Sequence, residues 1–213
     1  MLLPRDFFAR PSVEVAPDLL GCVLEHATAD GLVAVRLTEV EAYAGASDPA
    51  SHAWRGRTAR NAVMFGPPGH AYVYFTYGMH FCVNLVCLGE AGSASAVLLR
   101  AGEIVAGEDL ARARRTRGAA VISSRDLARG PARLCQALAI DRTLDGADVC
   151  VPSSPLRVRS GAGTPPRSVK ILTGPRVGVS RATEIPWRFW FEGDPTVSVY
   201  RPAVPRRRKL VTP

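Results

Sequence analysis

Hydrophobic and polar residues alternate over several stretches of the chain, which is the pattern of half-buried β-strands. Two such runs lie within residues 22–43, on either side of Asp30-Gly31, a dipeptide typical of a tight hairpin turn. Further runs rich in aromatic and β-branched residues cover 71–87 and 94–104. We therefore expect two hairpins and another strand in the first half of the chain.

Helical signals are fewer and lie mostly between the strand regions. Residues 13–20 follow Ser12 and precede Gly21, and residues 107–118 have the charge pattern of a basic surface helix. Pro131 follows Gly130, which suits the first position of a helix over 130–140. Residues 152–168, rich in Pro, Ser and Gly, are expected to form a surface excursion, and residues 187–201 a last strand region.

Strands that cluster early and late, with helices between them and no regular β-α-β alternation, favour the α+β class. We expect a curved, mainly antiparallel sheet with flanking helices and a protruding hairpin. The chain has 213 residues, no internal repeat and no composition boundary. We predict a single domain over residues 1–205, followed by a basic C-terminal tail over 206–213.

The charge of the chain is compatible with a nucleic-acid partner but does not establish one. The net charge is +8, and among 27 basic residues only Lys170 and Lys209 are lysines. Arginine binds phosphate bidentately and stacks on bases, which suits a nucleic-acid partner. No apolar window is long enough to span a bilayer or to act as a signal peptide, so a cytoplasmic protein without a membrane partner is expected.

The five cysteines are odd in number and form no C-x-x-C pair. Their neighbours are apolar, so we expect reduced thiols packed in the core.

Two carboxylates stand close together at the end of the second strand run. Strand alternation places Val33, Val35 and Leu37 on one face together with Glu39, Glu41 and Tyr43. With His52 nearby, the two acids fit three interpretations: an ion pair with arginine, a metal site, or a general base with a structural neighbour. The pattern alone leaves all three open.

Two other features suggest contacts with DNA. Tyr77 and Met79 flank Gly78 at an expected hairpin turn, where an exposed aromatic residue suits insertion between stacked bases unless another segment covers it. A helix that begins at Gly130, with Arg133 beside it, offers backbone N–H groups and positive charge to a phosphate. We assign the same kind of contact to Arg57.

Four strings resemble the alkyladenine DNA glycosylase family, also called methylpurine or 3-methyladenine DNA glycosylases of the human-like type. They occur in the family's order and cover most of residues 11–200. They read TEVEAYAGASDPASHAWRGRTARNAVMFGPPGHAYVYFTYGMHFCVNL, AVLLRA, GPARLCQALAI and PRVGVSRATEIPWRF.

The resemblance implies a monofunctional enzyme of base-excision repair that flips a damaged purine from duplex DNA and hydrolyses its N-glycosidic bond. Glu41 matches the general base that activates the attacking water, and Arg100 matches the arginine that positions this water and the glutamate. Val177 matches a backbone contact at the pocket. Glu39 then has no catalytic part.

The resemblance also assigns the base pocket and the wedge. Tyr43 and His52 match one wall, and Tyr74 matches the opposite, stacking wall. Asn84 matches the residue that obstructs an undamaged guanine. Tyr77 matches the residue that fills the gap left by the flipped nucleotide, with Met79 beside it.

Double-stranded DNA with an alkylated or deaminated purine is the implied partner, for a monomer that needs no metal or organic cofactor. Two other functions stay open: a catalytically silent nucleic-acid-binding module of the same fold, and a metal-dependent hydrolase that uses Glu39, Glu41, His52 and His80.

The family pattern also constrains the hairpin. A two-residue turn would place Tyr74 and Asn84 on opposite faces, whereas the family places both near the pocket. We therefore predict a three-residue loop over Gly78 to His80, or a bulge, that pairs Tyr77 with Phe81 and sets Tyr74 across from Asn84.

Overall fold

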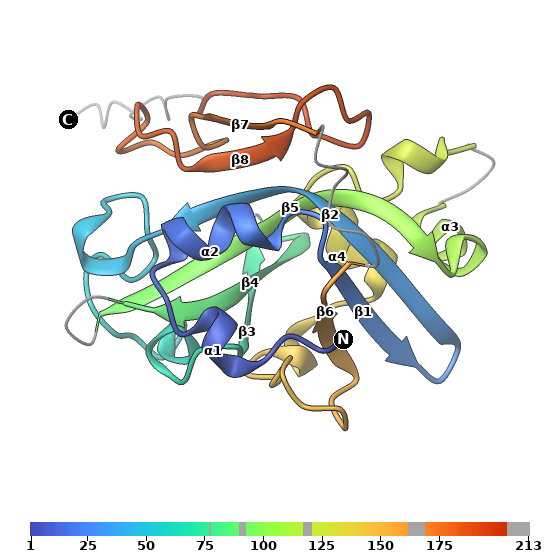
Figure 1. Ribbon diagram of the computed structural model, residues 1–213, viewed down its shortest axis with the longest axis horizontal. Coiled ribbons are helices and arrows are strands. Elements are labelled where there is room, and N and C mark those ends of the chain that lie inside the picture. The colour runs from blue at the N-terminus through green and yellow to red at the C-terminus, as the bar shows by residue number, and fades with distance from the viewer. Residues whose placement is uncertain (77, 90–92, 117–120, 162–168, 204–213) are drawn as a thin grey trace, which may run out of the picture.

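An antiparallel sheet of eight strands forms the centre of the molecule (Figure 1). The computed structural model describes residues 1–76, 78–89, 93–116, 121–161 and 169–203. Six strands follow the order β3-β4-β5-β2-β1-β6, while β8 pairs with both β2 and β7. The strands are β1 (Val23–Thr28), β2 (Gly31–Tyr43), β3 (Ala71–Thr76), β4 (His80–Leu88), β5 (Ala94–Ala106), β6 (Leu156–Arg159), β7 (Ile171–Gly174) and β8 (Arg188–Phe191).

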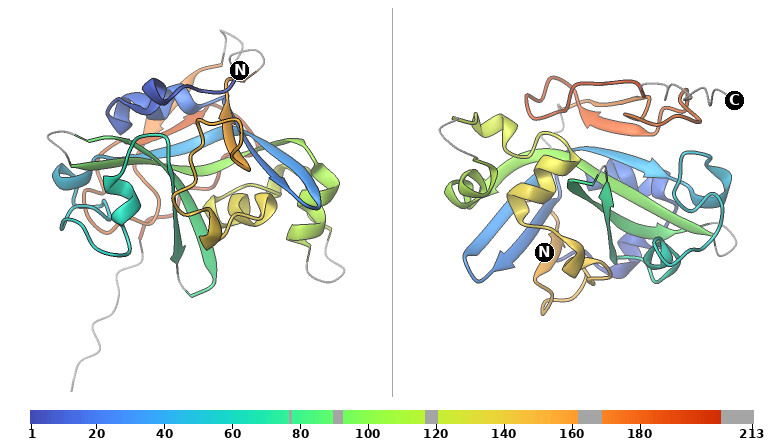
Figure 2. Two further views of the ribbon diagram at one scale, coloured as in Figure 1. Left: turned by 90° about the horizontal axis from the view of Figure 1, so that it is seen from below. Right: turned by 180° about the vertical axis from the view of Figure 1, so that it is seen from behind.

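Short helices cover the sheet. In the front view α1 and α2 lie over it, and from behind α4 does (Figure 1, Figure 2). The helices are α1 (Arg5–Phe8), α2 (Ser12–Leu19), α3 (Glu108–Arg115) and α4 (Pro131–Leu138), with 3-10 turns η1 (Gly45–Ser47), η2 (Ala62–Phe65), η4 (Ser124–Asp126) and η5 (Arg142–Leu144). The predicted α+β class with a curved sheet is confirmed.

The first hairpin and the helix at Pro131 form as the sequence predicts. Thr28 pairs with Gly31, whose positive φ of 132° suits glycine after the tight turn. Pro131 occupies the first turn of α4, where its missing N–H costs no hydrogen bond. The core contains residues from β1 to β6, β8, α1, α2 and α4, so it spans most of the described chain.

One expected loop contains a strand. Within residues 152–168, predicted to be a surface excursion, Leu156–Arg159 forms β6 against β1. Leu156 and Val158 are fully buried, so this prediction was wrong for those four residues. Burial of alternate apolar side chains outweighs the weak strand signal of a Pro- and Ser-rich segment. Residues 162–168 lie outside the described part.

The second strand changes its facing partway along. The core contains the odd-numbered Val33, Val35 and Leu37 of β2. After Leu37 it contains the even-numbered Val40 and Ala42 instead. Thr38 is an extra residue between the pairs Leu37–Gly102 and Glu39–Ala101, which marks a β-bulge. The prediction that Glu39, Glu41 and Tyr43 share a face with Leu37 was therefore wrong.

A second bulge on β5 compensates for the first. Arg100 is the extra residue there, because Leu99 pairs with Val40 and Ala101 with Glu39. Next to the bulges, Gly102 has no room for a Cβ, which would collide with the Arg36 carbonyl oxygen. The two bulges aim Glu39, Glu41 and Arg100 away from the apolar core, as bulges beside active sites often do.

The β3–β4 hairpin protrudes from the sheet (Figure 2). Thr76 pairs with His80, so its connection has three residues, 77–79. Tyr74 pairs with Cys82, and Tyr72, not Tyr74, lies across from Asn84. The predicted loop length and shared face are thus confirmed, but the register is one residue earlier on each strand. Phe81 pairs with Phe75, so the prediction that Phe81 pairs with Tyr77 was wrong.

Two further predictions bear on the chain as a whole. All five cysteines are unpaired, and every one except Cys150 is buried, which confirms the packed-thiol prediction. Among the described residues no helix is both long and apolar enough to cross a membrane. The predicted tail over 206–213 lies outside the described residues.

Candidate active site

A row of paired residues crosses the sheet beneath a cavity. Tyr72 pairs with Asn84, Asn84 with Leu98, Leu98 with Glu41, and Glu41 with Arg188. Directly paired residues on neighbouring strands project to the same face. The sheet therefore gathers side chains from five strands on one surface, although their positions span residues 41–188.

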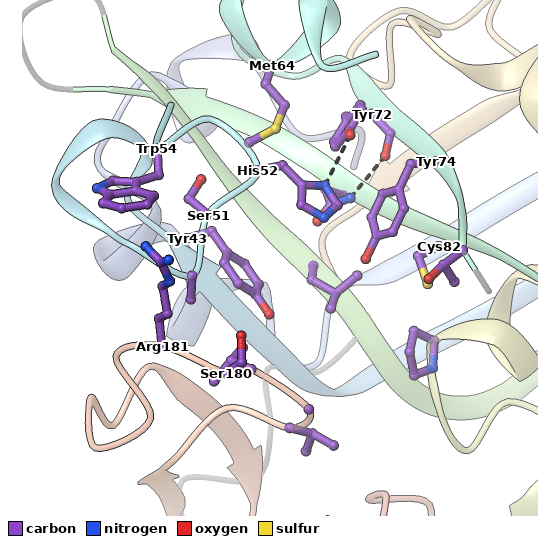
Figure 3. Close-up of a pocket in the computed structure, with 18 of the residues that line it drawn as sticks. Tyr43, Ser51, His52, Trp54, Met64, Tyr72, Tyr74, Cys82, Ser180 and Arg181 are labelled. Carbon is purple, nitrogen blue, oxygen red and sulfur yellow. Dashed lines mark hydrogen bonds between the residues drawn. The ribbon is translucent and has the colours of Figure 1, made fainter. Parts of the chain in front are cut away.

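The cavity above this row has a volume of about 670 Å³. Figure 3 shows its aromatic side chains facing one another across the open space. Its lining contains every predicted pocket residue and Arg100: Tyr43, His52, Tyr74, Asn84, Arg100 and Val177. The sequence did not identify several other lining residues, which include Ser51, Trp54, Met64, Tyr72, Cys82, Leu98, Pro131, Ser180 and Arg181.

Glu41 lies beneath this lining and is fully buried. Its Oε1 accepts a hydrogen bond from the Val177 N–H at 2.7 Å and lies 3.2 Å from Nη1 of Arg100. Its Oε2 accepts a hydrogen bond from the Tyr43 hydroxyl at 2.9 Å. Because Arg100, Val177 and Tyr43 all line the cavity, the carboxylate is separated from it by its own ion-pair and hydrogen-bond partners.

Glu39 is held by more groups than Glu41. Nε of Arg100 and Nε of Arg188 both donate to its Oε1 at 2.7 Å, and Ser198 donates through its backbone N–H and its hydroxyl. Burial alone would raise the pKa of Glu39, but the two arginines and Ser198 outweigh it and hold that pKa below its ordinary value. The ion-pair interpretation is correct for Glu39.

The metal interpretation does not fit these acids. Arg100 occupies the space between Glu39 and Glu41, where a cation would lie. Within the described ranges no group of three or more His, Cys, Asp or Glu residues could hold a metal ion. His80 is exposed on the hairpin and does not line this cavity.

Arg100 forms ion pairs with both carboxylates and is buried, with 5% of its surface exposed. Burial would lower its pKa, but Glu41 and Glu39 together raise it above its ordinary value. The guanidinium is therefore a permanent cation, as arginine is in proteins. One arginine divided between two acids is the central electrostatic feature of the site.

Three of the aromatic residues form a continuous wall. The rings of Tyr72 and Tyr74 stack with centroids 5.5 Å apart, and His52 meets Tyr74 edge-on at 4.6 Å. His52 and Tyr74 are therefore in contact, and the prediction that they form opposite walls does not describe this arrangement. Burial raises the pKa of Tyr43 and of Tyr74 well above the ordinary value, so both hydroxyls stay protonated.

His52 is a neutral ring near neutral pH. Although the residue is exposed overall, desolvation of its ring within the cavity and the charge of Arg60 both lower its pKa. Its Nδ1 lies 3.2 Å from the Tyr72 hydroxyl, an interaction that a dashed line marks in Figure 3. A neutral imidazole can accept this hydrogen bond and present an apolar face to a base.

A buried ion pair that the sequence did not reveal supports the wall behind Tyr43. Both Nη atoms of Arg176 donate to Asp48, at 2.5 and 2.8 Å, and both side chains are inaccessible. The Arg176 guanidinium also lies 4.7 Å from the centroid of the Tyr43 ring. The pair joins residues 128 positions apart, and the only signal in the sequence was an acid and an arginine within matched strings.

Arginines surround the open end of the cavity. Arg181 lies 4.6 Å and Arg55 5.5 Å from the centroid of the Trp54 ring, and Figure 3 shows Arg181 reaching toward Trp54. Arg60 lies 5.8 Å from the Tyr74 centroid. We call Arg55, Arg60 and Arg181 the rim arginines. All three are exposed, and none makes an ion pair with another described residue.

The remaining predicted residues lie outside the cavity. Arg57 is exposed, and Gly130 precedes α4, whose Pro131 lines the cavity. Arg133 is 3.7 Å from Asp126, so its charge is partly compensated. Met79 is 70% exposed at the hairpin tip, as a wedge residue would be, whereas the role predicted for Tyr77 concerns a residue outside the described part.

Comparison with known proteins shows the family of this chain. A family model described as methylpurine-DNA glycosylase matches residues 6–195. A protein of Streptomyces avermitilis with the name "Putative 3-methyladenine DNA glycosylase" is 60% identical over 209 residues, or 97% of this chain and 95% of that protein. Proteins of the same name from Frankia casuarinae and Leifsonia xyli are 53% identical over 95% and 92% of this chain, and over 93% and 92% of their own length. This chain belongs to the methylpurine-DNA glycosylase family, a family of DNA-repair enzymes that hydrolyse N-glycosidic bonds.

Proposed function

We propose that this protein removes alkylated or deaminated purines from double-stranded DNA by flipping the damaged base into the aromatic cavity. One observation carries the proposal: a carboxylate fixed by two hydrogen-bond donors and an ion pair with Arg100 lies at the base of a cavity walled by aromatic rings. Bases stack on aromatic faces, and extrusion is least costly for damaged or mispaired bases.

Glu41 is the proposed general base. Departure of a purine leaves positive charge on the sugar, as in other glycoside hydrolyses, and an adjacent carboxylate both stabilises that charge and accepts a proton from water. Arg100 and Val177, the two groups that contact Oε1, both line the cavity. We assign the attacking water to that side of the carboxylate.

Tyr43, His52 and Tyr74 are proposed to hold the extruded base, with Asn84 selecting against guanine. The Asn84 side chain is well fixed, because its Nδ2 donates to the Tyr72 carbonyl oxygen at 3.1 Å. Met79, with Tyr77, is proposed to occupy the gap that the base leaves in the duplex. Arg57, the rim arginines and the start of α4 at Gly130 and Arg133 would contact phosphates.

We further propose that the protein acts as a monomer, in the compartment that contains the chromosome. One protein chain supplies the cavity, the carboxylate and the rim arginines. The chemistry assigned to Glu41 uses only water and side chains of this chain.

The test is base release from duplexes that contain hypoxanthine, 1,N6-ethenoadenine or 3-methyladenine. Wild-type protein should release the free purine and leave an abasic site, identified by mass spectrometry of both products. Glu41→Gln should release a neutral base about 10²- to 10⁴-fold more slowly, because general-base help is lost. Release of a purine by Glu41→Gln at the wild-type rate would refute the mechanism, and no release from any duplex by the wild type would favour the silent binding module.

A further inference from the structure

Four buried charges form one cluster beneath the cavity: Glu39, Glu41, Arg100 and Arg188. Each has at most 5% of its surface exposed, and ion pairs of 2.7, 2.7 and 3.2 Å connect them through Glu39 and Arg100. Two acids and two arginines give this cluster no net charge. Charges buried in this way interact strongly, because little water screens them.

The other ionisable groups around Glu41 do not disturb this balance. Arg176 is nearby but is bound to Asp48, so the two contribute no net charge. Burial raises the pKa values of Tyr43, Tyr74 and Cys82, which keeps all three neutral. These groups come from β2, β3, β4 and the segments beside them, and Arg100 and Arg188 from β5 and β8 complete the surroundings.

Glu39 also fixes how Arg100 meets Glu41. Arg100 presents Nε to Glu39 at 2.7 Å, and only Nη1 reaches Glu41, at 3.2 Å. A guanidinium free of Glu39 could bind Glu41 with two parallel hydrogen bonds, which is the strongest arrangement for an arginine and a carboxylate. Such a pair would hold Glu41 in its ionised form and weaken it as a proton acceptor.

We propose that Glu39 is a positioning residue that divides Arg100 between two carboxylates and offsets the charge of Arg188, so that Glu41 keeps the basicity that the reaction needs. This inference rests on the proposed function of Glu41 as the general base. In this proposal Glu39 affects the reaction through Arg100 and Glu41, without contact with the substrate.

The test compares pH–rate profiles for hypoxanthine excision under single-turnover conditions. The acid limb of each profile is the part at low pH where the rate falls. In Glu39→Gln the cluster gains a net positive charge, so the acid limb should move to lower pH by about one unit or more, with a lower plateau rate. In Arg188→Gln the cluster gains a net negative charge, so the limb should move to higher pH. The double variant Glu39→Gln/Arg188→Gln restores neutrality and should return the limb toward the wild-type position.

Glu39→Asp provides a matched control that keeps the charge but shortens the side chain. Its plateau rate should fall while its acid limb stays in place. If Glu39→Gln does not fold, Arg188→Gln and the double variant still test the sign of the shift. A structural role alone predicts lower yields or rates without limb movement. Shifts of both single variants in one direction, or no shift in either, would overturn the inference.

The outcome for Glu41→Gln separates this inference from the proposed function. Full activity of Glu41→Gln would refute the function assigned to Glu41, whatever the other variants do. An inactive Glu41→Gln together with unmoved acid limbs in the Glu39 and Arg188 variants would refute only the role of Glu39.

Discussion

The floor of the cavity and its rim both contain arginines, in opposite electrostatic settings. Arg100 and Arg188 at the floor are buried against carboxylates, whereas the rim arginines are exposed and stack on aromatic rings without an acid partner among the described residues. Buried charges need partners, since desolvation of a lone charge is costly. Exposed arginines keep their charge available to a phosphate. The difference supports the proposal of chemistry at the floor and DNA binding at the rim.

The largest expected effect concerns the buried ion pair of Asp48 and Arg176 and its contribution to the stability of the protein. Asp48→Asn leaves the Arg176 guanidinium buried without its counter-charge, so the free energy of unfolding should fall by about 3–5 kcal/mol. Urea denaturation provides the measurement. Asp18→Asn is the matched control, because Asp18 pairs with Arg10 at 2.9 Å but is 53% exposed, and its loss should cost about 0–1 kcal/mol. Equal effects in the two variants would contradict the contrast between buried and exposed pairs.

A smaller effect should separate the two tyrosine hydroxyls of the cavity. Tyr43→Phe removes the hydrogen bond to Glu41 and keeps the ring, so single-turnover excision should slow by roughly tenfold or more, since such bonds to charged groups are worth about 1.5–3 kcal/mol. Tyr72→Phe loses the contact with His52 but leaves the hydrogen bonds of Glu41 in place, so it should slow excision less. If Tyr72→Phe slowed excision more than Tyr43→Phe, the hydrogen bond from Tyr43 to Glu41 would not have the importance assigned to it.

The arginines proposed to contact phosphates should affect the salt dependence of DNA binding. Arg181→Gln and Arg57→Gln should each weaken duplex binding and reduce the slope of log K against log salt concentration by about one, as expected for one lost phosphate contact. Fluorescence anisotropy at several salt concentrations measures both quantities. Arg36→Gln is the control, because Arg36 is paired with Glu103 at 2.5 Å. A slope that changes equally in all three variants would remove the distinction between paired and unpaired arginines.

The smallest effect concerns the protonation of His52. Its pKa is lowered by burial and by Arg60, so the folded protein binds this proton less readily than the unfolded chain. Stability from this residue is present above the unfolded pKa and declines as the pH falls below it. An NMR titration should place His52 below its ordinary value of 6.5, and Arg60→Gln should move it upward. A midpoint above 6.5 would show that the contact with Tyr72 has been assigned the wrong protonation state.

The sequence predicted those elements that local chemistry specifies. The turn before Gly31 and the helix start at Pro131 follow from backbone preferences of Gly and Pro, which act at a single residue. The family strings led to the residues that line the cavity, because each string places several of them together. The class and most strands followed from these local patterns.

The bulges, the short strands and the buried ion pair could not be predicted in the same way. Nothing about Thr38 or Arg100 as residue types indicates an extra position in a strand, although the pair of bulges turns Glu39 and Glu41 away from the core. The pair of Asp48 and Arg176 depends on the fold bringing distant segments together. Such features follow from tertiary packing, which overrides local preference.

The measurement that tests the division between floor and rim most directly is the single-turnover excision rate at saturating enzyme, compared with duplex affinity. For Glu41→Gln the account predicts a rate lower by about 10²- to 10⁴-fold with unchanged affinity for the duplex. For a variant with all three rim arginines changed to Gln it predicts weaker binding and an unchanged rate at saturation. A Glu41→Gln protein that excises hypoxanthine at the wild-type rate would contradict the account.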